Sequence, residues 1–256
     1  MTDLVALNNL THRGLRVAVD RAWRDHASVN VVGVVPREFP RLLAQYPVFF
    51  AKSPESGQFE PAALLGFASG ENLFLEDHGW DAPYVPLQIR RRPFELLQRR
   101  ADPVAGIPAS LDLALDMESP HVQAPNGERL FEDDGSATPL LQNISSIMNA
   151  LVAGSREAHN YTARLAELNL IEPVRIDIEF VDLSETKLAG LYWIAAAAVK
   201  ALTPPQLAEL RDREYLEWMY FQMASLAHVA ALVARKNKRI SGATAARGWT
   251  DHGAGR

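Results

Sequence analysis

The sequence predicts an α+β protein in which a strand-rich N-terminal half packs with a mainly helical C-terminal half. Two observations indicate this class. Residues 15–129 contain short β-branched and aromatic runs separated by turns rich in Pro and Gly, a pattern typical of strands. Residues 135–236 carry apolar side chains at helical spacing, interrupted by one strictly alternating stretch that predicts a β-hairpin.

The strands of the N-terminal half are predicted from six short apolar runs. They cover residues 29–35, 47–52, 62–68, 72–75, 84–89 and 111–117. Pro86 favours an edge position or a bulge for the fifth run, because proline has no N–H to donate to a neighbouring strand. Between the first two runs, residues 38–45 predict a short helix.

Helices dominate the prediction for the C-terminal half. Residues 140–168 form either one long helix or two, with Gly154 as a possible break. Residues 174–182 alternate as an amphipathic strand, and a turn over 183–187 returns the chain as a second strand at 188–194. Further helical segments are expected at residues 195–202, at 204–213 with Thr203 as N-cap, and at 214–235. We expect one domain over residues 1–236 and a disordered tail at 237–256, where Gly, Ala and Arg dominate.

Composition excludes several classes of function. The 256 residues include no cysteine, which rules out disulfides, thiolate nucleophiles and cysteine-ligated zinc or iron–sulfur sites. A net charge of −5 disfavours non-specific nucleic-acid binding. The N-terminus does not resemble a secretory signal, and the most apolar stretch is shorter than the roughly 20 residues that span a bilayer. We therefore expect a cytoplasmic protein without membrane insertion.

Motifs for catalysis, metals and cofactors are not found in the sequence. The seven histidines form no HExxH motif and no His pair at helical spacing. The sequence has neither the G-x-S-x-G motif of hydrolases nor a Gly-rich phosphate-binding loop. We predict no metal site and no cofactor, and we favour a non-enzyme.

The segment around three consecutive arginines is the main candidate for a binding surface. Its aromatic and basic residues are Trp80, Tyr84, Arg90, Arg91, Arg92 and Phe94. If the preceding strand continues through the arginines, Arg91 faces away from the other two, and at least one arginine then points inward and needs an acidic partner. A buried structural salt bridge and a contact with a ligand or partner are both open, because guanidinium groups serve either purpose.

Two further segments carry candidate binding residues. Gly70, Glu71 and Asn72 form a polar turn between two predicted strands, where the simplest role of glycine is to supply a positive φ. Trp218 belongs to the helix predicted over 214–235, whose wide apolar face is mainly core. An exposed Trp218 on the flank of that helix would instead indicate a groove for a partner.

Several motifs, taken in order, resemble the SapC family of bacterial proteins. They are an L-x-x-x-x-H-R segment at residues 7–13, EFP at 38–40, YPVFF at 46–50, LLGF at 64–67, GENLF at 70–74, W-x-x-x-YVP at 80–86, IRR-x-PF at 89–94, LFEDDG at 130–135 and LAGLYWI at 188–194. The chain departs from the family pattern in the IAAAAV stretch at 194–199 and in its Arg/Gly-rich tail. The resemblance implies an association with bacterial surface layers through the family name, and it implies no catalytic residue set.

Three hypotheses follow for the function. The first is a non-catalytic cytoplasmic accessory protein that binds a protein or peptide partner, with a homo-oligomer also possible. The second is an enzyme with a dispersed site, such as a metal-dependent oxygenase that modifies peptides or small molecules. The third is a factor in surface-layer biogenesis, which rests on the family name.

Overall fold

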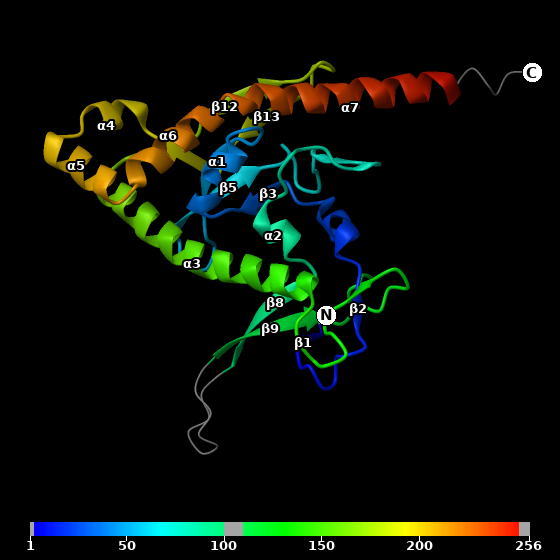
Figure 1. Ribbon diagram of the computed structural model, residues 1–256. Coiled ribbons are helices and arrows are strands. Elements are labelled where there is room, and N and C mark those ends of the chain that lie inside the picture. The colour runs from blue at the N-terminus through cyan, green and yellow to red at the C-terminus, as the bar shows by residue number, and fades with distance from the viewer. Residues whose placement is uncertain (1–2, 100–109, 251–256) are drawn as a thin grey trace, which may run out of the picture. The chain divides into compact units, whose positions relative to one another are not determined.

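The fold combines short antiparallel sheets with helices, the longest of which lie in the C-terminal half of the chain (Figure 1). The computed structural model describes residues 3–99 and 110–250. Strands are concentrated in the N-terminal half and helices in the C-terminal half, which confirms the predicted α+β class. The contacts divide the chain into two compact units, Met1–His26 with His78–Trp80 and Val85–Ala153, and Ala27–Asp77 with Asp81–Tyr84 and Gly154–Arg256. These units interleave along the sequence, and the single domain over residues 1–236 stays a prediction.

The first unit is built on a small antiparallel sheet. Its elements are β1 (Leu4–Ala6), β2 (Arg16–Val17), the 3-10 helix η1 (Val19–His26), β7 (Gly79–Trp80), α2 (Leu87–Arg90), β8 (Phe94–Arg99), β9 (Ser110–Asp116), β10 (Glu128–Arg129) and the beginning of α3 (Pro139–Glu167). Strand β9 lies between β1 and β8, and β10 pairs with β2. Strand β9 covers most of residues 111–117, which were predicted to be extended. Ala114 and Leu115 in this strand are fully buried.

The second unit is built on a five-stranded antiparallel sheet. Its elements are β3 (Val31–Gly33), the 3-10 helix η2 (Pro36–Glu38), α1 (Phe39–Leu42), β4 (Val48–Lys52), β5 (Phe59–Leu64), β6 (Leu75–Glu76), the rest of α3, β11 (Ile171–Pro173), β12 (Ile176–Glu179), β13 (Glu185–Leu188), β14 (Leu191–Ile194), α4 (Ala196–Lys200), α5 (Pro204–Asp212), α6 (Tyr215–Ser225) and α7 (His228–Thr250). The strand order is β11–β14–β4–β5–β3. Strands β12 and β13 form a separate hairpin, in register from Ile176 opposite Leu188.

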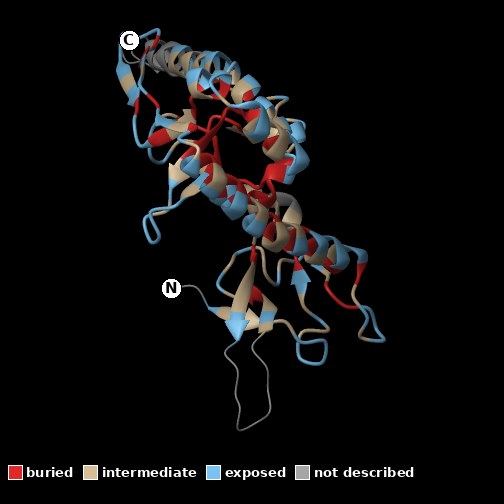
Figure 2. Ribbon diagram, turned by 90° about the vertical axis from the view of Figure 1, so that its left-hand side faces the viewer, coloured by how far each residue is buried: buried red, intermediate tan, exposed pale blue. Residues whose placement is uncertain are grey.

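Aromatic side chains fill the core between this sheet and its helices. Figure 2 shows buried positions gathered where helices and strands face one another and exposed positions on the outer faces. Phe49 and Phe50 of β4 are fully buried, and Phe50 packs beside Tyr161 of α3 with 6.1 Å between the ring centroids. Helix α6 contacts β4, β14 and α1, so it closes one side of the core.

Two predicted strands are wrong or largely wrong. Residues 84–89 do not form a strand, because Pro86 serves as N-cap of helix α2 and its carbonyl accepts the N–H groups of Ile89 and Arg90. Residues 72–75 contribute only Leu75 to a strand. The side-chain oxygen of Asn72 accepts the N–H of Phe74 at 3.0 Å, and this local bond favours a turn over an extended chain.

Helix α3 runs without a break through Gly154, which resolves the alternative of one helix or two. Gly154 lies against Val35, and a Cβ added there would be 2.6 Å from the Val35 Cβ. The absence of a side chain at Gly154 therefore lets the helix pack closely against the chain after β3.

The helix predicted at 214–235 is two helices. It ends at Ser225 and resumes at His228. At the end of α6 the Ser225 hydroxyl donates to the carbonyl of Gln222 at 2.7 Å and accepts the N–H of Val48 at 2.9 Å. The predicted disorder from residue 237 is wrong as far as Thr250, since α7 continues to that residue. Lys, Arg and Ala there have high helix propensity, and extending a helix avoids the cost of a new nucleus. Residues 251–256 lie outside the described residues.

The other predicted C-terminal elements are found, with one rearrangement. The two extended segments at 174–182 and 188–194 contain β12 and β14, but β14 pairs with β11 and β4 while β13 pairs with β12. Helix α5 begins after Thr203, whose backbone N–H donates to the side-chain oxygen of Gln206 at 2.9 Å. A hydrogen bond from the N-cap N–H to the side chain three residues later stabilises the first turn of a helix.

Candidate functional site

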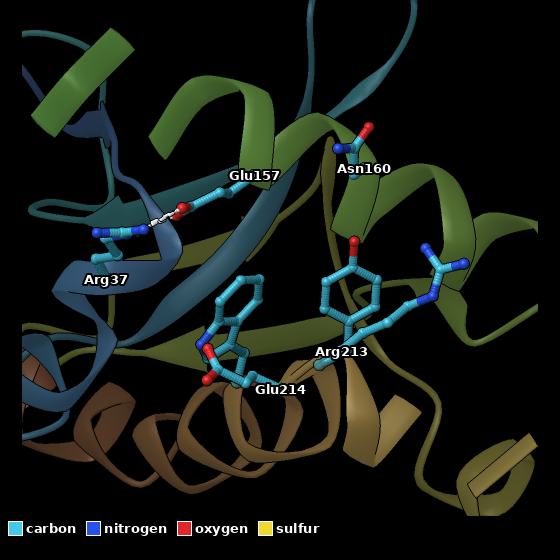
Figure 3. Close-up of a pocket in the computed structure, with 7 residues that line it drawn as sticks. Arg37, Glu157, Asn160, Arg213 and Glu214 are labelled. Atoms are coloured by element: carbon cyan, nitrogen blue, oxygen red, sulfur yellow. Dashed lines mark hydrogen bonds and ion pairs between the residues drawn. The ribbon is translucent and has the colours of Figure 1, made fainter. Parts of the chain in front are cut away.

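A cavity of about 360 Å³ in the second unit, the aromatic cavity, is the candidate functional site (Figure 3). It is lined by Arg37, Glu157, Asn160, Arg213, Glu214, Tyr215 and Trp218. The residues come from three segments, namely η2, the middle of α3 and the α5–α6 connection with the start of α6. The fold therefore assembles this cavity from positions far apart in the sequence.

Rings form the apolar wall of the aromatic cavity. Tyr215 and Trp218 lie on successive turns of α6, with 5.3 Å between their ring centroids. Tyr161 of α3 meets both rings edge-on, at 5.4 Å from Tyr215 and 5.5 Å from Trp218. Tyr161 and Tyr215 are buried, and burial raises the pKa of the Tyr161 hydroxyl well above its usual value. Trp218 is only half-buried, so part of its indole is available to a ligand.

Both arginines of the cavity are neutralised by acidic side chains. Arg37 donates to both oxygens of Glu157, at 3.0 and 2.9 Å from Nε, and Figure 3 shows the pair at one side of the cavity. The hydrogen bonds with Glu157 raise the pKa of Arg37. Arg213 lies 3.3 Å from Glu209, measured from Nε to Oε1. Each arginine thus already has an acidic neighbour within the fold, and Glu209 is shared between Arg213 and Arg164.

Glu214 and Asn160 supply the polar groups that the fold leaves available. Among the described residues, neither side chain makes a hydrogen bond or a close ion pair, and both are exposed. Glu214 is also in the left-handed region, with φ 64° and ψ 2°. A non-glycine residue there costs about 1–2 kcal/mol. This conformation turns the chain between α5 and α6 and places Arg213 and Glu214 together at the edge of the cavity.

Residues that carry the family motifs meet by hydrogen bonding in the second unit. The hydroxyl of Tyr84 donates to Oε1 of the buried Glu38 at 2.9 Å, and the other oxygen of Glu38 accepts the N–H of Val35 at 2.9 Å. The hydroxyl of Tyr46 donates to the carbonyl oxygen of Tyr84. The EFP, YPVFF and YVP motifs are therefore joined in one network of buried and partly buried hydrogen bonds.

Comparison with known protein families identifies the chain. A family model described as SapC matches residues 7–232. The chain belongs to the SapC family. No curated protein and no solved structure matches it.

The three arginines of this SapC protein have different environments. Arg91 is mostly buried and contacts Glu95, and it also bonds Gln88 at 2.6 Å and the carbonyl of Phe94 at 2.8 Å. Arg92 pairs with the same Glu95 at 2.5 Å. Burial lowers the pKa of Arg91 from its usual value. The inward arginine with an acidic partner exists, although it lies in a turn after α2 and not in a strand.

Arg90 has no such partner among the described side chains. It lies at the end of α2 and lines a smaller cavity in the first unit. Phe94 is fully buried in the core of that unit, which leaves it no contact surface. Trp80 is half-buried in β7.

The other candidates have structural contacts in the second unit of the SapC fold. Gly70 has φ +83°, the positive value that the turn was predicted to need. Glu71 accepts the N–H of Phe67 at 2.9 Å, and Asn72 is buried. Besides its bond to Glu38, Tyr84 lies under the guanidinium of Arg41, 5.5 Å from the ring centroid.

Of the sequence candidates, only Trp218 lies in the aromatic cavity. Sequence reasoning missed its other lining residues, since ordinary charged and polar side chains from separate segments carry no local pattern. Within residues 3–99 and 110–250 no group of three His, Asp or Glu side chains is placed to hold a metal ion. None of the helices in this part of the chain is long and apolar enough to cross a membrane.

Proposed function

We propose that this SapC protein is a non-catalytic accessory protein of the cytoplasm that binds a protein or peptide partner through the aromatic cavity. The observation that carries the proposal is the half-exposed Trp218 beside an unpaired carboxylate and an unpaired amide. Trp, Tyr and Arg are the residues most enriched at the energetic centres of protein interfaces. All three types line this cavity.

The charges of the aromatic cavity indicate the chemistry of the partner. Glu157 and Glu209 lie against the two arginines, and Glu214, whose charge also acts on Arg37, is the carboxylate of the cavity without a hydrogen bond or close ion pair among the described residues. A Lys or Arg side chain of the partner would pair with Glu214 and lie against the face of Trp218. Such a cation–π contact contributes about 0.5–2 kcal/mol, depending on how far it is desolvated.

The amide of Asn160 suits the backbone of a peptide. It offers a donor and an acceptor together, as a peptide bond does. A volume of about 360 Å³ lies near the lower end of the range for ligand pockets, roughly 300–1,000 Å³. We expect a short segment of the partner with one basic residue to occupy it.

Affinity purification of the tagged protein from its native host after cross-linking, read by mass spectrometry, tests the proposal. The variants are Trp218→Ala and Glu214→Gln, and the matched controls on the same helix are Tyr220→Ala and Glu217→Gln, which lie outside the cavity. We expect one dominant partner with the wild type and both controls, and its loss with both cavity variants. Thermal unfolding of each variant checks the fold, and Glu214→Gln keeps the test valid if Trp218→Ala is unstable.

Two results would overturn the proposal. Absence of any partner above background would reject the accessory role. Equal recovery of the same partner by all four variants would place the contact outside the aromatic cavity. For an identified partner, truncation of an interface tryptophan typically costs about 2 kcal/mol or more, which is roughly a 30-fold loss of affinity.

A further inference from the structure

A second cavity, in the first unit, combines an apolar interior with one unpaired cation. Its volume is about 180 Å³, and it is lined by Val19, Trp23, Val85, Ile89, Arg90, Asn143, Ile144 and Ile147. We call it the Arg90 cavity. It shares no residue with the aromatic cavity, so each site can be tested without the other.

The apolar lining of the Arg90 cavity comprises the partly exposed Val19, Trp23 and Val85 together with three isoleucines. Ile89 of α2 and Ile144 and Ile147 of α3 are 0%, 1% and 4% exposed, so they belong to the core of the unit. The size suits a single aliphatic or small aromatic side chain, since an engineered apolar cavity of about 150 Å³ holds benzene.

The rim of the Arg90 cavity carries its polar groups. Arg91 and Arg92 share the carboxylate of Glu95, whereas no described side chain pairs with Arg90. Asn143 on α3 is exposed and is likewise without a hydrogen-bond partner among the described residues. The rim therefore offers a guanidinium that binds an anion and an amide that can both donate and accept.

We infer that the Arg90 cavity binds the carboxyl terminus of a peptide whose last residue is aliphatic or aromatic. The last side chain lies among the apolar lining residues of the cavity, and the terminal carboxylate pairs with the Arg90 guanidinium through two parallel hydrogen bonds. The side-chain oxygen of Asn143 then accepts the N–H of the last peptide bond. A small carboxylic acid has no such N–H and would leave this acceptor without a partner. Capture of a terminal carboxylate by positioned donors is a recurring mode of peptide recognition.

Methyl NMR of the full chain, labelled at the isoleucine δ1 methyl groups, gives a local test. Three probes separate the chemistry: acetyl-Gly-Gly-Leu with a free carboxylate, the same peptide as its C-terminal amide, and 4-methylpentanoic acid, which keeps the apolar body and the carboxylate but has no peptide bond. We expect saturable shifts of Ile89, Ile144 and Ile147 with the free-acid peptide. Its affinity should exceed that of the amide by about tenfold or more, because a charge-assisted bond is lost.

Variants assign the contacts to residues. Arg90→Gln should weaken binding of the free-acid peptide by a similar factor, and the control Arg99→Gln, at the exposed end of β8 in the same unit, should leave it unchanged. Asn143→Ala should weaken binding of the free-acid peptide but not binding of 4-methylpentanoic acid. Because Asn143 is exposed, we expect Asn143→Ala to keep its fold. It therefore tests the site even if Arg90→Gln does not fold.

Three outcomes would overturn the inference. Unmoved isoleucine methyls with every probe would reject the site. Equal affinity for the free acid and the amide would reject the role of the Arg90 charge. Equal affinity for the peptide and 4-methylpentanoic acid, unaffected by Asn143→Ala, would make the ligand a small apolar carboxylic acid and reject the peptide terminus.

Discussion

Glu71 and Lys236 form an ion pair across 165 residues of sequence, with 2.5 Å between Oε1 and Nζ. The side chain of Glu71 is 13% exposed, and its second oxygen accepts the N–H of Phe67. The pair joins the turn of the GENLF motif to helix α7. Glu71 of the GENLF motif thus connects this turn to helix α7 within the second unit.

Substitution of Glu71 should destabilise the protein. Glu71→Ala leaves the Phe67 N–H and the Lys236 ammonium without their acceptor, and we expect a loss of about 1–3 kcal/mol in the free energy of unfolding. Glu76→Ala is the matched control, because Glu76 lies 3.8 Å from Arg239 in a longer, partly exposed pair that should contribute under about 1 kcal/mol. Chemical denaturation measures both, and equal effects would contradict the role given to Glu71.

Gly154→Ala should also destabilise the protein, although alanine has a higher helix propensity than glycine. Alanine favours a helix interior by about 1 kcal/mol over glycine. The close approach of Val35 leaves no room for the Cβ, so overpacking should reverse the sign and cost about 1–3 kcal/mol. Gly242→Ala on α7, with nothing within 4 Å of its added Cβ, should instead be neutral or stabilising. Thermal unfolding compares the two, and a stabilised Gly154→Ala would refute the packing argument.

Stability at acid pH should depend on Glu209. Arg164 donates to both its oxygens, at 3.0 and 2.7 Å, and these bonds lower the pKa of Glu209 from its usual value. The folded state therefore binds its proton less readily than the unfolded chain. The stabilisation is present above the unfolded pKa and is lost as pH falls through the folded pKa.

The test is the melting temperature of Glu209→Gln between about pH 6 and pH 3. We expect the variant to be less stable than the wild type at the upper end and to approach it at the lower end. Glu217→Gln, an exposed carboxylate on α6, should parallel the wild type throughout. A constant gap between Glu209→Gln and the wild type would contradict the assignment.

The arginine run should separate into structural and available positions. Arg91→Gln removes a mostly buried guanidinium from Glu95, Gln88 and the Phe94 carbonyl, and should cost about 1–3 kcal/mol of unfolding free energy. Arg90→Gln should change it by less than about 0.5 kcal/mol, as most surface substitutions do. Urea denaturation of the two variants is the measurement. Similar losses for both would mean that Arg90 is also part of the structural network.

Local patterns in the sequence were sufficient for the fold class and for many of the elements. The spacing of Ile144, Ile147 and Leu151 predicted α3, and the capping residue Thr203 predicted the start of α5. Such predictions succeed because period and capping are properties of neighbouring residues. The turn at Gly70 was predicted for the same reason.

Only the tertiary structure decided which side chains meet. It brought Arg37, Glu157 and Glu214 to Trp218, and it placed Arg90 beside Ile144 and Ile147. Close approach of Val35 explains Gly154, and the Ser225 hydroxyl at the end of α6 accepts the N–H of Val48 in β4. These relationships depend on distances between segments that are remote in sequence. The packing of the whole core sets those distances, and no local period or propensity encodes them.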